Sequence, residues 1–341
     1  MPTTSYWNSS VWVDPDVASR MESGSPDVAG ALAMAAQFAP LAARIGHSSW
    51  SVLSALATIG SRDLTVARTI EPHLDALAII IQSRTTLEPA PSYPLNATWG
   101  VYAASPPGTT VLAERQPSTD SWTLTGIKPW CSLADRLSHA LVTASVPDGR
   151  QQLFAVDLRQ ASVDAAMSQW MAHGLRGVTT GSVHLDAAEG HPVGPAGWYV
   201  ERPGFAWGGI AVAAIWFGAA AALAGALWTT AAKRTPDQVG LMHMGSCDIA
   251  LHNAVLALQS AARSMDDAEV SPHEAAVLAA RTRSCVAEAA ERVMTTVGHA
   301  LGPGPLAFDA AHLQRVADLT LYVRQHHAER DTARLGLLIA P

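Results

Sequence analysis

Trp130 and Ser132, in the segment Lys128-Pro129-Trp130-Cys131-Ser132, are close in the sequence and could act together on a ligand. An aromatic ring followed two residues later by a hydroxyl is what a protein can present to a planar heterocycle such as a flavin. Pro129 has no amide N–H to donate, so we expect the strand before it to end there, with Trp130 at the strand margin. The same pattern also suits a strand-end tryptophan that fills a core, and the rest of the chain has to separate these two possibilities.

This segment resembles the K-x-W-I-[ST] motif of the acyl-CoA dehydrogenase family of flavoproteins. In that family the tryptophan packs against the isoalloxazine ring of the flavin, and the hydroxyl residue approaches the reactive nitrogen of the ring. The resemblance implies these two roles for Trp130 and Ser132, with Cys131 in place of the usual aliphatic residue.

A second segment, VYAASPPGTT at residues 101–110, resembles the family's A-L-T-E-P-x-x-G-S-D motif, whose main chain and serine hold the flavin ring and the pyrophosphate. The resemblance implies main-chain contacts to the ring from Tyr102 and Ala103. It also matches Gly108 to the glycine of the motif and puts Thr109 in place of its serine. The Thr-Glu pair of the motif is replaced by two alanines, so an ordinary Pro-Pro-Gly loop without a ligand is the alternative.

Two further positions resemble family contacts to the far end of the cofactor. Arg234 loosely matches the arginine of an Arg-x-x-Phe-Gly segment that meets the pyrophosphate of a partner subunit. Gly298 begins a Gly/Pro-rich stretch where the family has an adenine-binding turn reached from a neighbouring subunit. Without the resemblance, this stretch would be an ordinary connection between two helices.

The usual catalytic residue of the family is missing. Acyl-CoA dehydrogenases remove the α-proton of an acyl thioester with a glutamate while the flavin takes the β-hydrogen as hydride. A carboxylate in a closed apolar pocket suits this task because desolvation raises its pKa. The family carries the glutamate at one of two positions, and these are occupied here by Arg324 and Gly208.

Three residues near the end of the chain are candidate catalytic groups in its place: Arg324, His326 and His327. Asp331 follows His327 by four residues, so on one helix face it would orient the imidazole. The alternative is a polar cluster that holds the last helix against a neighbouring subunit. The two histidines have no further ligand at suitable spacing, so we expect no metal.

A polar cluster also interrupts an apolar helix that we expect to begin after Asp63. It contains Arg68, Glu71, His73 and Asp75, and Pro72 within it predicts a kink or a break. The cluster is either the polar lining of a substrate channel or a local network of ion pairs and hydrogen bonds. The network is the commoner arrangement, and we favour it here.

The pattern of the chain predicts a multidomain protein with helical and β regions. Residues 1–95 indicate an N-terminal helical domain, and residues 96–200 a central antiparallel β-barrel or sandwich, because short apolar runs there alternate with turn formers. Residues 201–341 indicate a C-terminal four-helix bundle with long helices. Their expected extents are 206–232, 246–266, 272–299 and 309–335. A capping box at Ser271 and Glu274 marks the start of the third.

Composition narrows the possible partners. Hydrophobic residues are 49% and charged residues 15% of the 341, so we expect subunit contacts to cover part of the surface, in a homodimer or a homotetramer. The net charge of −7 argues against a nucleic-acid partner. The three cysteines are widely scattered, which favours a reducing cytoplasm.

One stretch is long enough to cross a bilayer, since residues 203–232 carry no charge. It consists mostly of alanine and glycine, which suit close helix contacts inside a protein better than contact with lipid. We therefore expect no membrane span and assign this stretch to the innermost helix of the bundle.

The family resemblance extends in α–β–α order over nearly the whole chain. It implies an FAD-dependent oxidoreductase acting on the CH–CH group of an acyl-CoA or acyl-carrier thioester, with FAD between the β-domain and the bundle. Because the glutamate is missing, two alternatives stay open. One is a two-component flavin-dependent monooxygenase of the same fold, supplied with reduced flavin by a separate reductase. The other is a non-catalytic relative that binds flavin or thioester, or only assembles with a true dehydrogenase.

Overall fold

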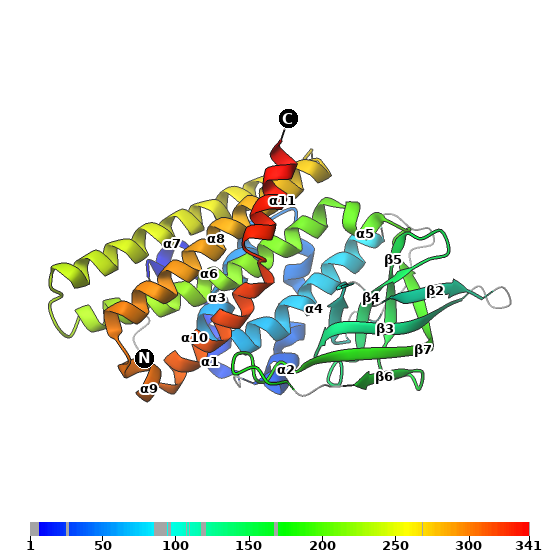
Figure 1. Cartoon of the computed structure of the whole chain (residues 1–341), viewed down its shortest axis with the longest axis horizontal. Helices are drawn as coiled ribbons and strands as arrows, with labels where there is room; N and C mark the ends of the chain where they lie inside the picture. The colour runs from blue at the N-terminus through cyan, green and yellow to red at the C-terminus, as the bar shows by residue number, and fades with distance from the viewer. Residues whose placement is uncertain are drawn as a thin grey trace.

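In the computed structural model, helices from both ends of the chain pack together, and the middle of the chain forms a mixed sheet beside them at one end of the molecule (Figure 1). The structure describes residues 7–24, 27–84, 94, 97–106, 108, 110–116, 121–166, 170–267 and 269–340. The expected boundary between the first two domains, at residues 95 and 96, lies outside these residues.

In the described residues before the sheet, the chain forms four α-helices and two short 3-10 segments. Asp63 caps the last of these helices by accepting a hydrogen bond from the amide of Val66, as predicted. That helix continues through Pro72 without a break. The helices are α1 (Pro15–Ser23), α2 (Val28–Phe38), α3 (Ser49–Arg62) and α4 (Leu64–Ser83).

The part of the middle region that the structure describes contains seven strands in one sheet, and most neighbours in it are antiparallel. The prediction of an antiparallel arrangement is wrong for β1, which pairs with β4 in parallel, and β2 also meets β4 in parallel. Two other strands separate β1 from β4 in the chain, which leaves room for the crossover that parallel pairing needs. The strands are β1 (Trp99–Tyr102), β2 (Val111–Arg115), β3 (Trp122–Ser132), β4 (His139–Ser145), β5 (Gln151–Asp157), β6 (Val163–Ala166) and β7 (Thr180–Val193).

Strand β3 does not end at Pro129, contrary to the prediction. It continues to Ser132 with an irregularity in its pairing to β7 between Lys128 and Cys131. Two residues of β3 there face one residue of β7, and Trp130 adopts a φ of 60°. The bulge takes Pro129 out of the ladder, so its missing N–H costs no hydrogen bond.

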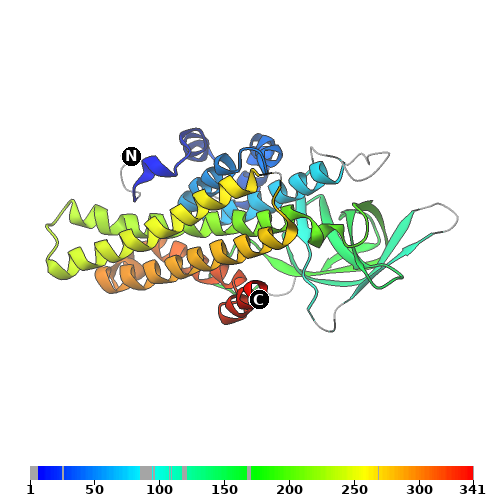
Figure 2. The ribbon, with the colours of Figure 1, turned by 90° about the horizontal axis from the view of Figure 1, so that it is seen from above.

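The helices expected to begin at 206, 272 and 309 begin at Pro203, Pro272 and Ala310, and the capping box of Ser271 and Glu274 is present. The prediction is wrong for the start of α7, which begins at Gln238, eight residues before the expected 246. Figure 2 shows the N-terminal helices on one side of the layer formed by α6, α7 and α8, with the C-terminal helices on the other side. The helices are α5 (Trp198–Glu201), α6 (Pro203–Ala231), α7 (Gln238–Met265), α8 (Pro272–Leu301), α9 (Gly304–Phe308), α10 (Ala310–Tyr322) and α11 (Glu329–Ile339).

The final long helix expected at 309–335 is interrupted. After α10 the chain makes a 3-10 turn over Val323–Gln325, His326 is extended and Ala328 has a φ of 47°. The break turns the buried His326 inwards and lets α11 start in a new direction across α8.

Helix α6 forms the centre of the helical region. It is the one described helix long and apolar enough to pass as a membrane span, and 94% of its apolar window is buried inside the protein. It packs against α3, α7 and α8. The prediction that this stretch is the innermost helix is therefore confirmed.

Candidate functional site

Three of the predicted cofactor residues converge beside α4. The Tyr102 hydroxyl donates a hydrogen bond to the main-chain carbonyl of Ser132 (3.0 Å), and the Ser132 hydroxyl lies 2.9 Å from Thr180 Oγ1. Arg68 Nη2 donates to Ser132 Oγ from α4 at 3.4 Å. The ring of Trp130 borders the same small hollow and is 65% exposed, so it does not fill a core.

The loop after β1 is held from inside the sheet by Lys128. Its ammonium donates to Thr143 Oγ1 (2.7 Å), to the Thr143 carbonyl (2.9 Å) and to Ser105 Oγ (3.3 Å). Burial lowers the pKa of Lys128 to about 8. Ala103 and Gly108 lie on this loop, and Gly108 has a φ of 86°, which suits glycine. Thr109 lies outside the described residues.

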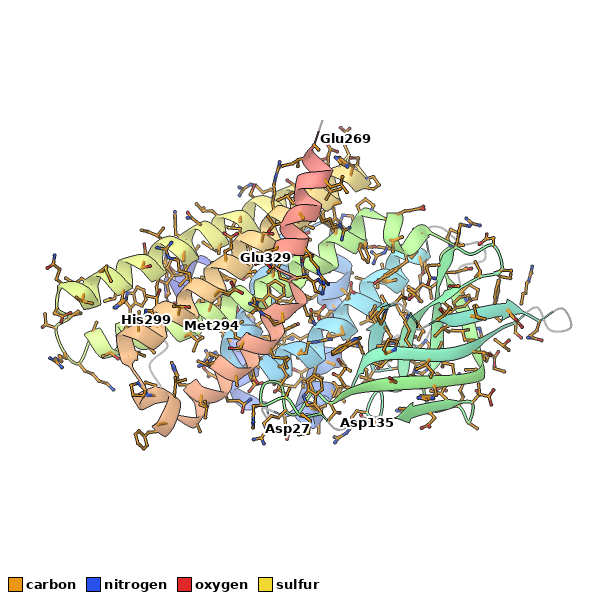
Figure 3. All side chains as sticks on the ribbon, viewed as in Figure 1. Asp27, Asp135, Glu269, Met294, His299 and Glu329 are labelled. Atoms are coloured by element: carbon orange, nitrogen blue, oxygen red, sulfur yellow. The ribbon has the colours of Figure 1, made fainter. Side chains whose placement is uncertain are left out.

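Arg234 and Gly298 lie far from this hollow within one chain. Arg234 borders a separate hollow of about 230 Å³ formed by the end of α6 and the start of α7. Gly298 is near the end of α8, beside His299, which Figure 3 labels at the end of the helices away from the sheet. The two residues therefore cannot reach a molecule held at Trp130 in the same chain.

The main cavity is a hollow of about 620 Å³ between α4, α6, α8 and the break before α11. Its wall mixes apolar side chains with acids, arginines and histidines, so it can hold an organic molecule and also exchange protons with it. The charged and titratable side chains that line it are Glu71, Asp75, Tyr199, Arg202, Arg283, His326, His327, Asp331 and Arg334.

Glu71 and Asp75 face this cavity from one side of α4, since they are four residues apart. The pKa of Glu71 is raised to about 7, mainly by burial, with the nearby charge of Asp75 adding to the rise and Arg68 and Arg283 opposing it. Burial also raises the pKa of Asp75, against the attraction of Arg202. A carboxyl whose pKa lies near neutrality is suited to acid–base work.

Two glycines at the start of α6 make room for these charges. A side chain at Gly208 would place its Cβ 3.1 Å from Asp75 Oδ1, and one at Gly209 would place it 3.2 Å from Arg283 Cδ. The Gly209 carbonyl accepts a hydrogen bond of 2.7 Å from Arg283 Nη1. Arg283 also lies over the ring of Trp216, 4.8 Å from its centre.

The three predicted catalytic residues divide between the cavity and the surface. His326 is buried, its Nε2 lies 3.0 Å from Ser284 Oγ, and burial lowers its pKa. His327 lines the cavity rim but its side chain is 64% exposed, with Nδ1 3.6 Å from Asp331 Oδ1. Arg324 pairs with Glu291 on the outer face of α8 and does not line the cavity.

Asp331 lies near both histidines in a way that one continuous helix would not allow. Its carboxylate accepts the main-chain N–H of His327 (3.1 Å) and lies 3.9 Å from His326 Nε2. The expectation that His327 and Asp331 share a helix face is wrong, because His327 precedes the start of α11.

Glu71 and Asp75 belong to the polar cluster that the sequence indicated, for which a local network was favoured over the lining of a substrate channel. Both descriptions hold in part, because Arg68 Nη1 lies 3.7 Å from Glu71 Oε2 while the two acids line the cavity. The spacing of Arg68, Glu71 and Asp75 on one face of an apolar helix was the available signal. Arg202 and Arg283 were missed, since nothing in their local sequence distinguishes them from surface arginines.

Comparison with sequence models of protein families finds no match. Comparison with curated protein sequences also finds none.

Solved structures give clear similarities at low sequence identity. The FMN-bound TdsC from Paenibacillus sp. A11-2 is 18% identical, with a TM-score of 0.78 over 94% of this chain and 92% of that one. KijD3, in complex with FMN and dTDP-3-amino-2,3,6-trideoxy-4-keto-3-methyl-D-glucose, is 16% identical, with a TM-score of 0.77 over 100% and 98%. Butyryl-CoA dehydrogenase from Megasphaera elsdenii is 16% identical, with a TM-score of 0.73 over 85% and 81%. The chain therefore has the acyl-CoA dehydrogenase fold, as the sequence resemblance implied.

Proposed function

We propose that this chain, built on the acyl-CoA dehydrogenase fold, is a flavin-dependent oxidoreductase with its flavin ring against Trp130 and its substrate in the main cavity. One observation carries the proposal: the part-buried side chain of Arg68 contacts both places. Arg68 reaches Ser132 on one side and Glu71, in the cavity wall, on the other. A molecule in the cavity and a ring beside Ser132 would thus be neighbours.

The residues beside α4 fit a flavin ring. The bulge of β3 holds Trp130 out of the ladder with an exposed face, and the hydroxyl of Ser132 is fixed between Thr180 and Arg68. The hydrogen bond from the Tyr102 hydroxyl holds the main-chain carbonyl of Ser132 in place. A bound flavin would supply the two-electron acceptor, or the oxygen-activating reductant, that no side chain can provide. The chain's own residues would hold the ring and fix its orientation.

The expected cofactor is FAD, and its adenosine end would require a second copy of the chain, because Arg234 and Gly298 lie at the wrong end of their own chain. Apolar residues on the outer face of α7 support such an assembly, a homodimer or homotetramer. Met242, Ile249 and Leu256 recur there every seven residues and are about half exposed or more. TdsC and KijD3 were crystallised with FMN, which needs no adenosine contact, so identifying the cofactor released on denaturation distinguishes the two forms.

The reaction we favour is dehydrogenation of the CH–CH group of an acyl-CoA or acyl-carrier thioester in the cytoplasm. The carboxylates of the main cavity support it, since they restore an acid–base group to a site whose two usual positions hold Gly208 and Arg324. Bleaching of the bound flavin by a panel of acyl-CoA thioesters tests this reaction directly.

A two-component flavin-dependent monooxygenase is the second candidate. It is favoured by the similarity to TdsC, a dibenzothiophene monooxygenase whose structure covers 94% of this chain. Oxygen consumption that depends on added reduced flavin, with no bleaching by acyl-CoA, would select this function. Copurification with a second dehydrogenase-like chain, without turnover, would instead identify a non-catalytic subunit.

Trp130→Ala tests the flavin position. We expect the variant to bind flavin about 5- to 150-fold more weakly than the wild type and to retain correspondingly less after purification, because stacking on an aromatic ring contributes about 1–3 kcal/mol. The visible absorption spectrum and the amount of released flavin measure the change, and Trp130→Phe, which keeps a ring, should retain most of it.

Unchanged flavin content in a Trp130→Ala protein with a wild-type circular dichroism spectrum would remove this residue from the cofactor site. A colourless wild-type protein that does not bind added FAD or FMN would overturn the proposed function itself.

A further inference from the structure

The start of α6 and the middle of α4 together form an acid site that neither helix forms alone. Gly208 has no side chain, and the space that its Cβ would face is taken by the carboxylate of Asp75 from α4. Position 208 is one of the two positions at which the resemblance leads us to expect a glutamate. Asp75 therefore places a carboxylate beside position 208, although residue 208 itself is a glycine.

Asp75 and Glu71 have few competing partners. Among the residues that the structure describes, the Asp75 carboxylate has no hydrogen bond and no ion pair within 4.0 Å, and Glu71 has only the 3.7 Å pair with Arg68. Glu71 is 7% exposed, so its ionised form is poorly solvated. Two acids four residues apart in such a setting hold one proton between them more readily than none.

We propose that Asp75 is the general base that takes a proton from the substrate in the main cavity. This inference rests on the proposed function and assigns its missing residue. In the step, a substrate C–H bond breaks, its electron pair stays on the carbon, and the proton forms an O–H bond on Asp75. The negative charge moves from the carboxylate to the substrate.

The surroundings of the pair suit this transfer. Burial raises the pKa of both acids, and the positive charge of Arg202 opposes this rise at Asp75, as Arg68 and Arg283 oppose it at Glu71. Arg202 and Arg283 both line the cavity, and in the described part of the chain neither has a carboxylate within 4.0 Å. Their guanidinium groups can stabilise the charge that develops on a substrate oxygen, as in an enolate of a thioester.

The pair is separate from the histidines of the break. His326 hydrogen-bonds Ser284, and His327 is exposed at the rim beside Asp331. The charged and titratable groups that face the acid pair come from α4, α5 and the turn after it, α8, α10 and the segment before α11. They are Arg68, Tyr199, Arg202, Arg283, Tyr322, His326 and His327, together with Asp331 and Arg334 of α11 itself.

The test separates proton removal from flavin chemistry. A four-carbon acyl-CoA thioester is incubated with the protein as purified in deuterium oxide, and loss of its α-hydrogen is followed by proton NMR. This exchange needs a base but no electron transfer. We expect exchange in the wild type and a loss of at least about 100-fold in Asp75→Asn, the usual range for removing a general base. Asp186→Asn, which changes an exposed acid of β7, is the matched control.

A second variant protects the test against a folding defect. Gly208→Glu in the Asp75→Asn background puts a carboxylate at the usual family position and should recover at least about tenfold of the lost exchange. If a folded Asp75→Asn protein exchanges the α-hydrogen at the wild-type rate, the assignment of the base is overturned. An absence of exchange in the wild type would also overturn it. If exchange follows the expected pattern while no acyl-CoA bleaches the flavin, the base assignment stands and the dehydrogenase function fails.

Discussion

Helix α6 contains two glycine sites that serve opposite purposes. Near its middle, a Cβ at Gly218 would lie 1.9 Å from the Ala57 carbonyl oxygen of α3, so the two helices touch backbone to backbone. At its start, a Cβ at Gly208 would lie 3.1 Å from a carboxylate oxygen of Asp75. The first glycine closes the core and the second leaves space for an acid at the edge of a cavity.

The difference shows how one helix can both stabilise the protein and build its site. The middle of α6 is buried on all sides among apolar residues, where small side chains allow close packing. Its first two turns face α4 and α8, from which Asp75 and Arg283 reach towards it. Substitutions at the two ends should therefore affect different properties.

Gly218→Ala should have the largest effect on stability. The methyl group would overlap the backbone of α3, which cannot move aside as a flexible side chain would, so we expect the free energy of unfolding to fall by about 3 kcal/mol. Urea denaturation followed by circular dichroism measures the change. Gly245→Ala, at a position on α7 with open space around its Cβ, is the control and should be neutral or slightly stabilising. Equal stability of the Gly218→Ala and wild-type proteins would refute the close contact.

Glu71→Gln should have the next largest effect and should act through pH. The pKa of Glu71 is raised by burial to about 7 in the folded protein, whereas in the unfolded chain it is close to 4.5. The folded state thus binds the extra proton between these values, and the wild type should lose stability on the order of 2 kcal/mol as pH rises from 4.5 through 7.

The glutamine variant should lack this part of the pH dependence, because it has no proton to lose. The unfolding free energies of both proteins at pH 5 and pH 8 give the comparison. If the difference between the two proteins is the same at both pH values, Glu71 is ionised at pH 5 and the shared proton does not exist.

Gly208→Ala should have the smallest effect on stability, within about 1 kcal/mol of the wild type, because alanine favours the helix while the Asp75 carboxylate has to move by a few tenths of an ångström. The same variant should slow deuterium exchange of the acyl-CoA α-hydrogen several-fold, because it displaces the proposed base. If Gly208→Ala loses as much stability as Gly218→Ala, the start and the middle of α6 are packed equally closely.

Much of the local structure was readable from the sequence. The caps at Asp63 and at Ser271 with Glu274 lie where predicted, because a side chain three residues from an unpaired amide is a short-range feature. The uncharged, alanine- and glycine-rich composition of the α6 segment predicted a helix buried inside the protein. The resemblance of several motifs to one family, together with the α–β–α order, indicated the fold that the solved structures share.

The tertiary structure decided where the chemistry gathers. Asp75, Gly208 and Arg283 come from three helices and are more than 70 residues apart in sequence, so no local pattern connects them. The bulge at Pro129 and the break before α11 likewise depend on partners elsewhere, the β7 ladder for one and the buried contact of His326 with Ser284 for the other. Capping and periodicity act over one or two turns of chain, whereas the position of a carboxylate in a cavity depends on how whole helices pack.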